Sequence, residues 1–321
     1  MKPFNVFPYD SNIQFMRLRW VSLTIAALMM FVALGAMATK GFNLALDFTG
    51  GVGIELRFPK APDVDDIRAK LTSAGYEAAQ VQTFGTGTDI LVRLQDKPRA
   101  QAQGTDGGHA TSVAQDVRQI VSTPDNPAEV RSSAQISAQV GKELALNGVY
   151  ALIFVVLGFL IYISFRFELK FALAAIVTTL HDVIVVAGWF ALTGHEFDLT
   201  VLAGVLSVMG YSINDTIVVF DRVRENFRSM RADPSEVLNK SINQTLSRTV
   251  ITSFVAALTV VALYVYGGGS LRGMAESQLI GILIGTLSSI FVACPLLLWF
   301  GVTKQDLMPK ARDEAALARR P

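Results

Sequence analysis

Long apolar segments divide the chain into lengths that fit a membrane. Spanning about 30 Å of hydrocarbon takes roughly 20 apolar residues in a helix. Segments of this kind occur six times, at Trp20–Ala38, Leu144–Ile163, Phe171–Leu192, Leu199–Phe220, Val250–Tyr266 and Leu279–Phe300. Hydrophobic residues make up 51% of the 321 residues and charged residues only 17%, a balance that soluble domains rarely show. The pattern predicts a polytopic α-helical membrane protein with six transmembrane helices.

The polar stretch between the first two spans is long enough for one small folded domain. Alternating apolar residues predict strands at 51–58, 78–84, 89–95 and 128–136, and helical spacing predicts helices at 63–75 and 112–121. The order β-α-β-β-α-β is that of a ferredoxin-like fold. We therefore expect one external α+β ferredoxin-like domain between helices 1 and 2. Residues 97–112 are rich in Gly, Gln, Asp and Thr without an apolar period, which predicts a flexible loop.

Lysine and arginine indicate the orientation of the chain in the membrane. They are concentrated before the first span, between the second and third, between the fourth and fifth, and after the sixth. The short loops on the opposite side hold only Arg272. Because positive charge stays on the cytoplasmic side, both termini are expected there and the long external segment on the other side. The expected division is 1–39 for the cytoplasmic N-terminus and first helix, 40–142 for the external head domain, 143–302 for helices two to six, and 303–321 for a cytoplasmic tail.

The first span and the single cysteine bear on whether the chain has a signal peptide, a disulfide or a cysteine-based metal site. Lys2, Arg17 and Arg19 precede the first span, as they would the core of a signal peptide. The span is longer than a typical signal core of about 7–15 residues, which favours a membrane helix, while small residues in "LGAMATKG" leave cleavage as the alternative. The one cysteine, Cys294, lies inside the last span, so neither an internal disulfide nor a cysteine-based metal site is expected.

The motif "LDFTGG", from Leu46 to Gly51, lies between the first span and the first strand. Gly50 and Gly51 allow backbone angles that other residues avoid, which predicts a turn. A phosphate-binding loop would carry Lys followed by Ser or Thr and lead directly into a helix. Neither feature follows Gly51, so the motif does not favour nucleotide binding.

Polar residues interrupt three of the spans. His181 and Asp182 lie within the third, Asn214 and Asp215 within the fourth, and Arg248 at the start of the fifth. A charge at the bilayer centre costs at least about 2.5–3.5 kcal/mol on insertion scales, so such residues usually face a bundle interior or water. The helical rise places Asp215 about 9 Å and Arg248 about 12 Å inward from the same side of the membrane. The acid and the base therefore reach similar depth, where they can pair directly or through water.

Each of these residues also has a structural interpretation. Arg248 can extend to the headgroups, as long cationic side chains near helix ends do. His181 and Asp182, which the helical rise places about 18 Å inward, can form a hydrogen-bonded pair between helices. Asp215 is too short to reach the interface, and its neighbours on the same helix are polar. We interpret Asp215 as a proton relay, an acid that gains and loses a proton as its surroundings move.

At these residues the sequence resembles the SecF family, the smaller membrane subunits of the SecD–SecF complex that assists bacterial protein export. The stretches that carry the resemblance are "LDFTGG", "GKELALNG", "LHDVIVVAGWFALTGHEFDLTVLAG", "MGYSINDTIVVFDRVREN" and "TLSRT", in the family's order from position 46 to 249. The motif in the fourth span is long and unusual for a membrane helix. "LDFTGG" is shared with SecD, but this chain has one set of six spans and so resembles SecF alone.

The resemblance implies an architecture similar to that of proton-driven efflux pumps, with two six-span halves facing each other in the bacterial inner membrane. A SecD-like subunit would supply the second half. Proton flow would drive the periplasmic heads, which help to pull unfolded preproteins outward after SecA and the SecYEG channel deliver them, with YajC as a further partner. The match places the family's proton-path acid on Asp215 and its arginine on Arg248, with Asn214, Asp182 and His181 in the same segments.

Asp47, Gly50 and Gly51 carry the family motif at the junction of the head and helix 1. The resemblance implies no enzymatic activity, cofactor or metal, with the proton gradient as the energy source, and no nucleic-acid partner; membrane lipids surround the helices. Three other classes stay open. Half of a proton-coupled exporter of lipids or small molecules would share the architecture, and a purely structural partner of SecD would share the sequence pattern. Two intramembrane acids also occur in aspartyl proteases, although the estimated depths of Asp182 and Asp215 differ by several ångströms.

Overall fold

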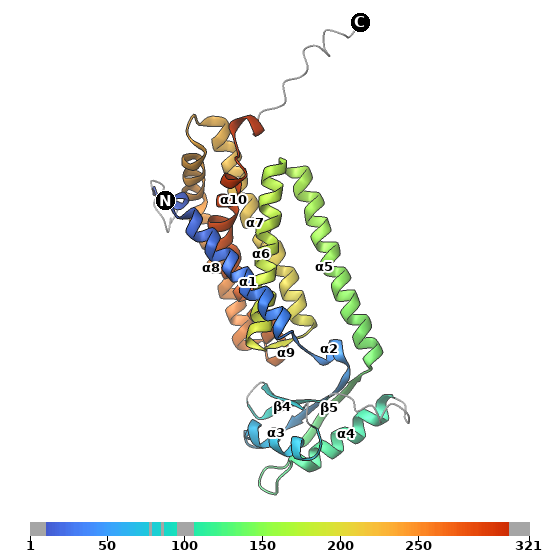
Figure 1. Ribbon diagram of the computed structural model, residues 1–321. Helices are drawn as coiled ribbons and strands as arrows, with labels where there is room; N and C mark the ends of the chain where they lie inside the picture. The colour runs from blue at the N-terminus through green and yellow to red at the C-terminus, as the bar shows by residue number, and fades with distance from the viewer. Residues whose placement is uncertain (1–10, 77–78, 85–86, 95–105, 308–321) are drawn as a thin grey trace.

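The computed structural model describes residues 11–76, 79–84, 87–94 and 106–307. It consists of a bundle of long helices with a small α/β head domain at one end (Figure 1). Within the described residues, six helical segments are long and apolar enough to cross a membrane: Phe15–Thr39, Gln139–Arg166, Leu169–Thr193, Leu199–Ser229, Pro234–Tyr266 and Leu271–Trp299. They overlap the six expected spans, and the head lies between the first and the second, so the expected fold class is confirmed.

The elements follow one another in a simple order. The chain contains a 3₁₀ turn Phe15–Leu18, α1 Arg19–Thr39, β1 Asn43–Leu44, α2 Leu46–Thr49, β2 Gly51–Arg57, α3 Val64–Ser73, β3 Gln80–Phe84, β4 Asp89–Leu94, α4 Asp106–Val121, β5 Glu129–Ile136, α5 Ala138–Arg166, α6 Leu169–Thr193, β6 Glu196–Phe197, α7 Leu199–Ser229, α8 Pro234–Tyr266, α9 Gly269–Ser288, a π-helical turn Ser289–Ala293, α10 Cys294–Trp299 and a 3₁₀ turn Lys304–Leu307.

The head domain has a four-stranded sheet in the order β3-β4-β2-β5, with every neighbouring pair antiparallel. This is the order in which a β-α-β-β-α-β chain forms a ferredoxin-like sheet. Alternation places Val52, Ile54 and Leu56 of β2 on the buried face, where they meet apolar residues of α3 and α4. The other face of the sheet turns toward the helical bundle (Figure 1).

Helix α4 begins earlier than the sequence pattern predicted. Residues 106–112 were expected in a loop, but they belong to the helix Asp106–Val121. Ala110, Ala114, Val117 and Val121 are all buried at helical spacing. The alanine at the start of this face is small, so the apolar period is weak there and was missed. Residues 97–105 of the expected loop lie outside the described residues.

Helices α6, α7 and α9 form the interior of the bundle, and α5 lies at its side (Figure 1). Close approach requires glycine at two crossings. A Cβ atom on Gly188 of α6 would overlap Ala33 of α1, and one on Gly281 of α9 would overlap Val208 of α7. Small residues at helix interfaces let membrane helices pack by van der Waals contact, since hydrocarbon supplies no hydrophobic drive between them.

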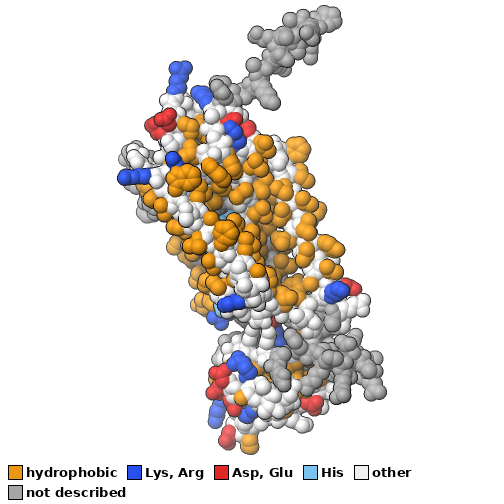
Figure 2. Space-filling model, in the orientation of Figure 1, with side chains coloured by type: hydrophobic (Ala, Val, Ile, Leu, Met, Phe, Trp, Pro, Cys, Tyr) orange, Lys and Arg blue, Asp and Glu red, His pale blue; other side chains and the backbone are white. Residues whose placement is uncertain are grey.

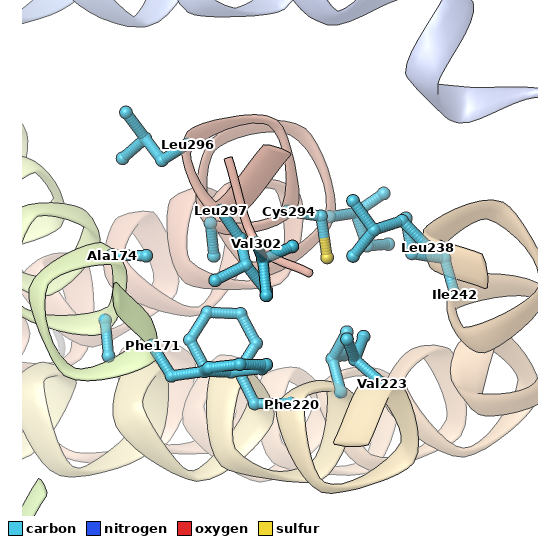
Figure 3. Close-up of a cluster of buried hydrophobic side chains, with 14 of the residues drawn as sticks. Phe171, Ala174, Phe220, Val223, Leu238, Ile242, Cys294, Leu296, Leu297 and Val302 are labelled. Carbon is cyan, nitrogen blue, oxygen red and sulfur yellow. The ribbon is translucent and has the colours of Figure 1, made fainter. Parts of the chain in front are cut away.

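A dense apolar core lies at the distal end of the bundle, the end away from the head. Phe171 of α6 and Phe220 of α7 are fully buried, with ring centroids 5.3 Å apart in an edge-to-face arrangement. Figure 3 shows Leu238 and Ile242 of α8 beside Cys294 at the opposite side of this cluster. The free cysteine therefore packs as a small apolar side chain.

The face of the bundle seen in Figure 2 carries a broad apolar band, with charged side chains gathered at its two ends and on the head. Large apolar side chains on α5 are fully open, with Phe154 78% and Phe165 90% exposed. Apolar exposure on this scale fits contact with lipid or with another membrane subunit.

Candidate functional site

The two buried acids of the bundle lie on neighbouring helices, Asp182 on α6 and Asp215 on α7. Asp182 is close to the midpoint of α6, which crosses without a break from Leu169 to Thr193. Ser212 of α7 lies at the same depth, since it bonds to Asp182. Asp215 follows Ser212 by one turn, about 5 Å farther from the head. The two acids are therefore neighbours in depth but occupy separate surroundings.

Asp182 is the centre of a buried hydrogen-bond network. Its Oδ2 atom accepts hydrogen bonds from the hydroxyls of Ser212 on α7 at 2.5 Å and of Ser288 on α9 at 2.6 Å. Its Oδ1 atom lies 2.9 Å from Nδ1 of His181. None of Asp182 is exposed. The histidine–aspartate pair thus forms within α6, and the bonds between helices are made by the two serines.

Asp215 has fewer hydrogen-bond partners among the described residues than Asp182. Its side chain is buried, near the Ser253 hydroxyl of α8 and within electrostatic range of Arg248. One of its oxygens, Oδ2, has no hydrogen-bond partner among the described residues. Leaving a buried polar atom in this state costs about 1–3 kcal/mol unless water or a proton satisfies it. The carboxyl group therefore has free capacity for a proton.

Arg248 and Asn214 lie on the outside of the bundle. Both are exposed, whereas Asp215 is buried. Arg248 makes no direct ion pair with Asp215, and its guanidinium has no acidic partner in the part of the chain that the structure describes. The arginine and the acid are therefore within electrostatic range of each other without a direct ion pair.

The "LDFTGG" motif forms a compact turn at the junction of head and bundle. Leu46–Thr49 make one helical turn, and Gly50 and Gly51 follow with φ angles of 75° and 140°. Such angles favour glycine, which explains the pair. The Asp47 carboxylate accepts a hydrogen bond at 3.3 Å from the backbone N–H of Leu199, the first residue of α7. Asp47 therefore contacts the helix that carries Asp215.

The arrangement fits proton movement better than hydrolysis. Asp182 and Asp215 share no hydrogen bond, and each has its own partners, whereas an aspartyl protease needs two carboxyl groups that share a proton. Among the described residues, no three His, Cys, Asp or Glu side chains are grouped so as to hold a metal ion. What the site offers is an enclosed acid with one open oxygen and an arginine nearby.

Four further hydroxyl residues of this region were not among the expected site residues. Ser288 bonds to Asp182, and Ser253 lies 2.6 Å from Thr286 between their hydroxyl oxygens. The Tyr211 hydroxyl lies near the latter pair without a hydrogen-bond partner of its own among the described residues. Small and hydroxyl residues within an apolar span, as in "GTLSS" from 285 to 289, are a sequence signal for helix contacts.

Two models of known protein families match the chain. The family model for the protein export membrane protein SecD/SecF, C-terminal, matches residues 116–303, and the model for the SecD/SecF GG motif matches residues 35–60. The second match contains Asp47, Gly50 and Gly51, and the first contains the polar residues of the bundle.

Similar proteins match over almost the whole chain. Protein translocase subunit SecF of Pseudomonas aeruginosa is 43% identical over 304 residues, 94% of this chain and 96% of its own length. Its counterpart in Escherichia coli O157:H7 is 39% identical, over 94% and 92%. The crystal structure of SecDF, a translocon-associated membrane protein from Thermus thermophilus, covers 93% of this chain with a TM-score of 0.78 and 34% identity, and this chain spans 40% of that longer one. The chain belongs to the SecF family of protein translocase subunits.

Proposed function

We propose that this chain, together with a SecD-like partner, uses the proton gradient to help complete preprotein export across the bacterial inner membrane after SecA and SecYEG have acted. Family membership and the match to SecDF support protein export and a SecD partner. Both termini are then cytoplasmic and the head is periplasmic, where it acts on unfolded preproteins; YajC is a further partner. No catalytic chemistry, cofactor or metal enters the proposal.

The single observation that carries the proton role is the state of Asp215. A buried acid with one unpartnered oxygen, within range of a cation, is placed to take up and release a proton. Asn214 and Arg248 border it on the outside of the bundle. His181 and Asp182 lie one turn nearer the head, and we propose that they border the path while their hydrogen bonds hold the helices that line it.

The exposed face beside Asp215 supports a path made by two subunits. A cation that faces hydrocarbon costs at least about 2.5–3.5 kcal/mol on insertion scales. Arg248 and Asn214 present a charge and an amide on the outside of α8 and α7, where none of the described residues covers them. Packing of a second six-span subunit against this face would enclose both groups and complete the proton path.

The test is Asp215→Asn in the assembled complex, reconstituted in vesicles with a proton gradient. The substitution nearly preserves shape but removes the titratable proton. We expect normal assembly with the partner and loss of proton-dependent stimulation of export. Asp221→Asn is the matched control, because Asp221 is a carboxylate of the same helix that pairs with Arg166 at 2.7 Å near the surface. This control should keep the stimulation.

Further variants follow from the same geometry. Asp215→Glu keeps the proton and moves it by one methylene, so partial stimulation is expected. Arg248→Met removes the positive charge beside Asp215 and should abolish the stimulation, whereas Arg248→Lys keeps the charge without the planar donor fork and should retain part of it. Full proton-dependent export by Asp215→Asn contradicts the proposal, and loss of assembly in that variant assigns Asp215 a structural role.

A further inference from the structure

The loop between α6 and α7 connects the polar site to the head. Only residues 194–198 separate the two helices that carry Asp182 and Asp215. Because helices are stiff along their axes, a displacement of this loop displaces the ends of both. Asp215 lies about 24 Å along α7 from the loop at the usual helical rise.

Strand pairing is the first contact between this loop and the head. Glu196 and Phe197 form β6, which pairs in parallel with β1, the short strand between α1 and the head. The backbone N–H of Ala45 donates to the Phe197 carbonyl at 3.0 Å and continues the pairing. Phe197 packs between Phe42 and Phe190, with ring centroids 4.9 and 5.9 Å away. The loop therefore contacts both the bundle and the segment that joins α1 to the head.

A partly buried ion pair is the second contact. Arg93 of β4 meets Glu196, with side chains only 19% and 10% exposed. Gln82 of β3 donates to the other Glu196 oxygen at 2.9 Å. Arg93 and Gln82 lie on the sheet face that α3 and α4 leave open, the face that turns toward the bundle (Figure 1). One glutamate of the loop therefore holds two strands of the head.

The third contact uses the GG motif. Asp47 accepts from the N–H of Leu199 at the start of α7, and Gly50 leads directly into β2 of the head. A Cβ atom on Gly141 of α5 would stand 3.0 Å from the Gly50 nitrogen, so the first turn of α5 also packs closely on the motif. The motif therefore joins the head sheet to the starts of α5 and α7.

We propose that Arg93, Glu196 and Asp47 are positioning residues that transmit movement between the head and the helices carrying the buried acids. The inference rests on the proposed function for its link to protons, but the junction itself is defined by the contacts above. The Arg93–Glu196 pair carries the main side-chain connection between the sheet and the α6–α7 loop. Breaking it should uncouple the head from the proton path without removing the path.

The test uses charge reversal in the full complex. Arg93→Glu should leave proton flux within about twofold of the parent and reduce proton-stimulated export at least about fivefold, the low end of typical coupling between sites. The double variant Arg93→Glu with Glu196→Arg restores opposite charges and should recover most of the loss. Arg57→Glu is the matched control, because Arg57 forms its ion pair with Asp89 inside the head at 2.7 Å.

A distance measurement keeps this inference separate from the proton role. Spin labels at Ala69→Cys on α3 and Tyr266→Cys at the end of α8, both exposed, report head-to-bundle distance in a Cys294→Ser background. Arg93→Glu should broaden the distribution and the charge swap should narrow it again. An unchanged distribution, or equal broadening by Arg57→Glu, overturns the junction. If the parent complex shows no proton-stimulated export, the proposed function is overturned. The distance distributions still test whether the Arg93–Glu196 pair holds the head to the bundle.

Discussion

Replacing Ser212 and Ser288 by alanine measures how much the Asp182 hydrogen-bond network contributes to the stability of the bundle. Each donates one hydrogen bond to the same oxygen, from α7 and α9. Hydrogen bonds between membrane helices contribute about 0.6 kcal/mol on average and up to about 1.7. Because these two are short and reach a carboxyl group, we expect about 1 kcal/mol for each Ser→Ala change. The remaining serine still satisfies the oxygen in either single variant.

The double variant should cost more than the sum. With both serines replaced, Asp182 Oδ2 is buried without a donor, which adds a penalty of about 1–3 kcal/mol. We therefore expect a total of about 3–5 kcal/mol and a coupling energy of at least about 1 kcal/mol between the two sites. The assay is reversible unfolding of the purified protein in bicelles, analysed as a double-mutant cycle.

Two comparisons make this reasoning refutable. Ser207→Ala is the matched control, because Ser207 is an exposed serine of α7 whose hydroxyl donates to the Ala203 carbonyl of its own helix. It should change stability by less than about 0.5 kcal/mol. In an Asp182→Asn background the serine changes should lose most of their coupling, since one amide oxygen replaces two carboxylate oxygens. Additive serine effects, or equal coupling in that background, would show that the network does not act through Asp182.

Two further predictions concern packing and the head. Gly188→Ala should force α1 away from α6 and cost about 1–3 kcal/mol in the same unfolding assay, since its Cβ would overlap Ala33; Gly158→Ala, which meets no atom within 4 Å, should be neutral. The head domain, expressed alone as residues 42–139, should melt cooperatively. In this domain the hydrogen bond from Arg57 holds the pKa of Asp89 below its usual range. Asp89→Asn should therefore lower the melting temperature at pH 7, and the difference from the parent should narrow as the pH falls below about 4; a difference that does not narrow as the pH is lowered contradicts this.

The sequence predicted the number and order of helices well because the bilayer sets a length that apolar residues must fill. It did not predict where helices extend beyond that length. α8 begins at Pro234, with Asp233 before it, although apolar counting placed the span from Val250. The proline at the first position of a helix is a start signal that apolar counting does not use. The ends of helices outside hydrocarbon depend on such capping signals and on packing, not on hydropathy.

The last span shows a second limit. It runs from α9 through a π-helical turn at Ser289–Ala293 into α10, which contains Pro295. Proline lacks the N–H that an α-helix would bond four residues back, so the backbone hydrogen bonds shift locally. The sequence contains the proline, but it does not say whether the helix ends, bends or widens there. Neighbouring helices decide that outcome.

The two buried acids show why site residues could be located but not distinguished from the sequence. Both Asp182 and Asp215 interrupt apolar spans next to another polar residue, and both fit a proton path on that basis. In the fold, Asp182 receives two hydroxyl donors from other helices and lies against His181, while Asp215 keeps an oxygen without a partner. A carboxyl group whose acceptors are filled stabilises one arrangement of helices, whereas one with an open oxygen changes its bonding at little cost when a proton arrives. The geometry therefore favours a holding role for Asp182 and the proton-binding role for Asp215, a division that depends on helix rotation and so on the packing of all three helices.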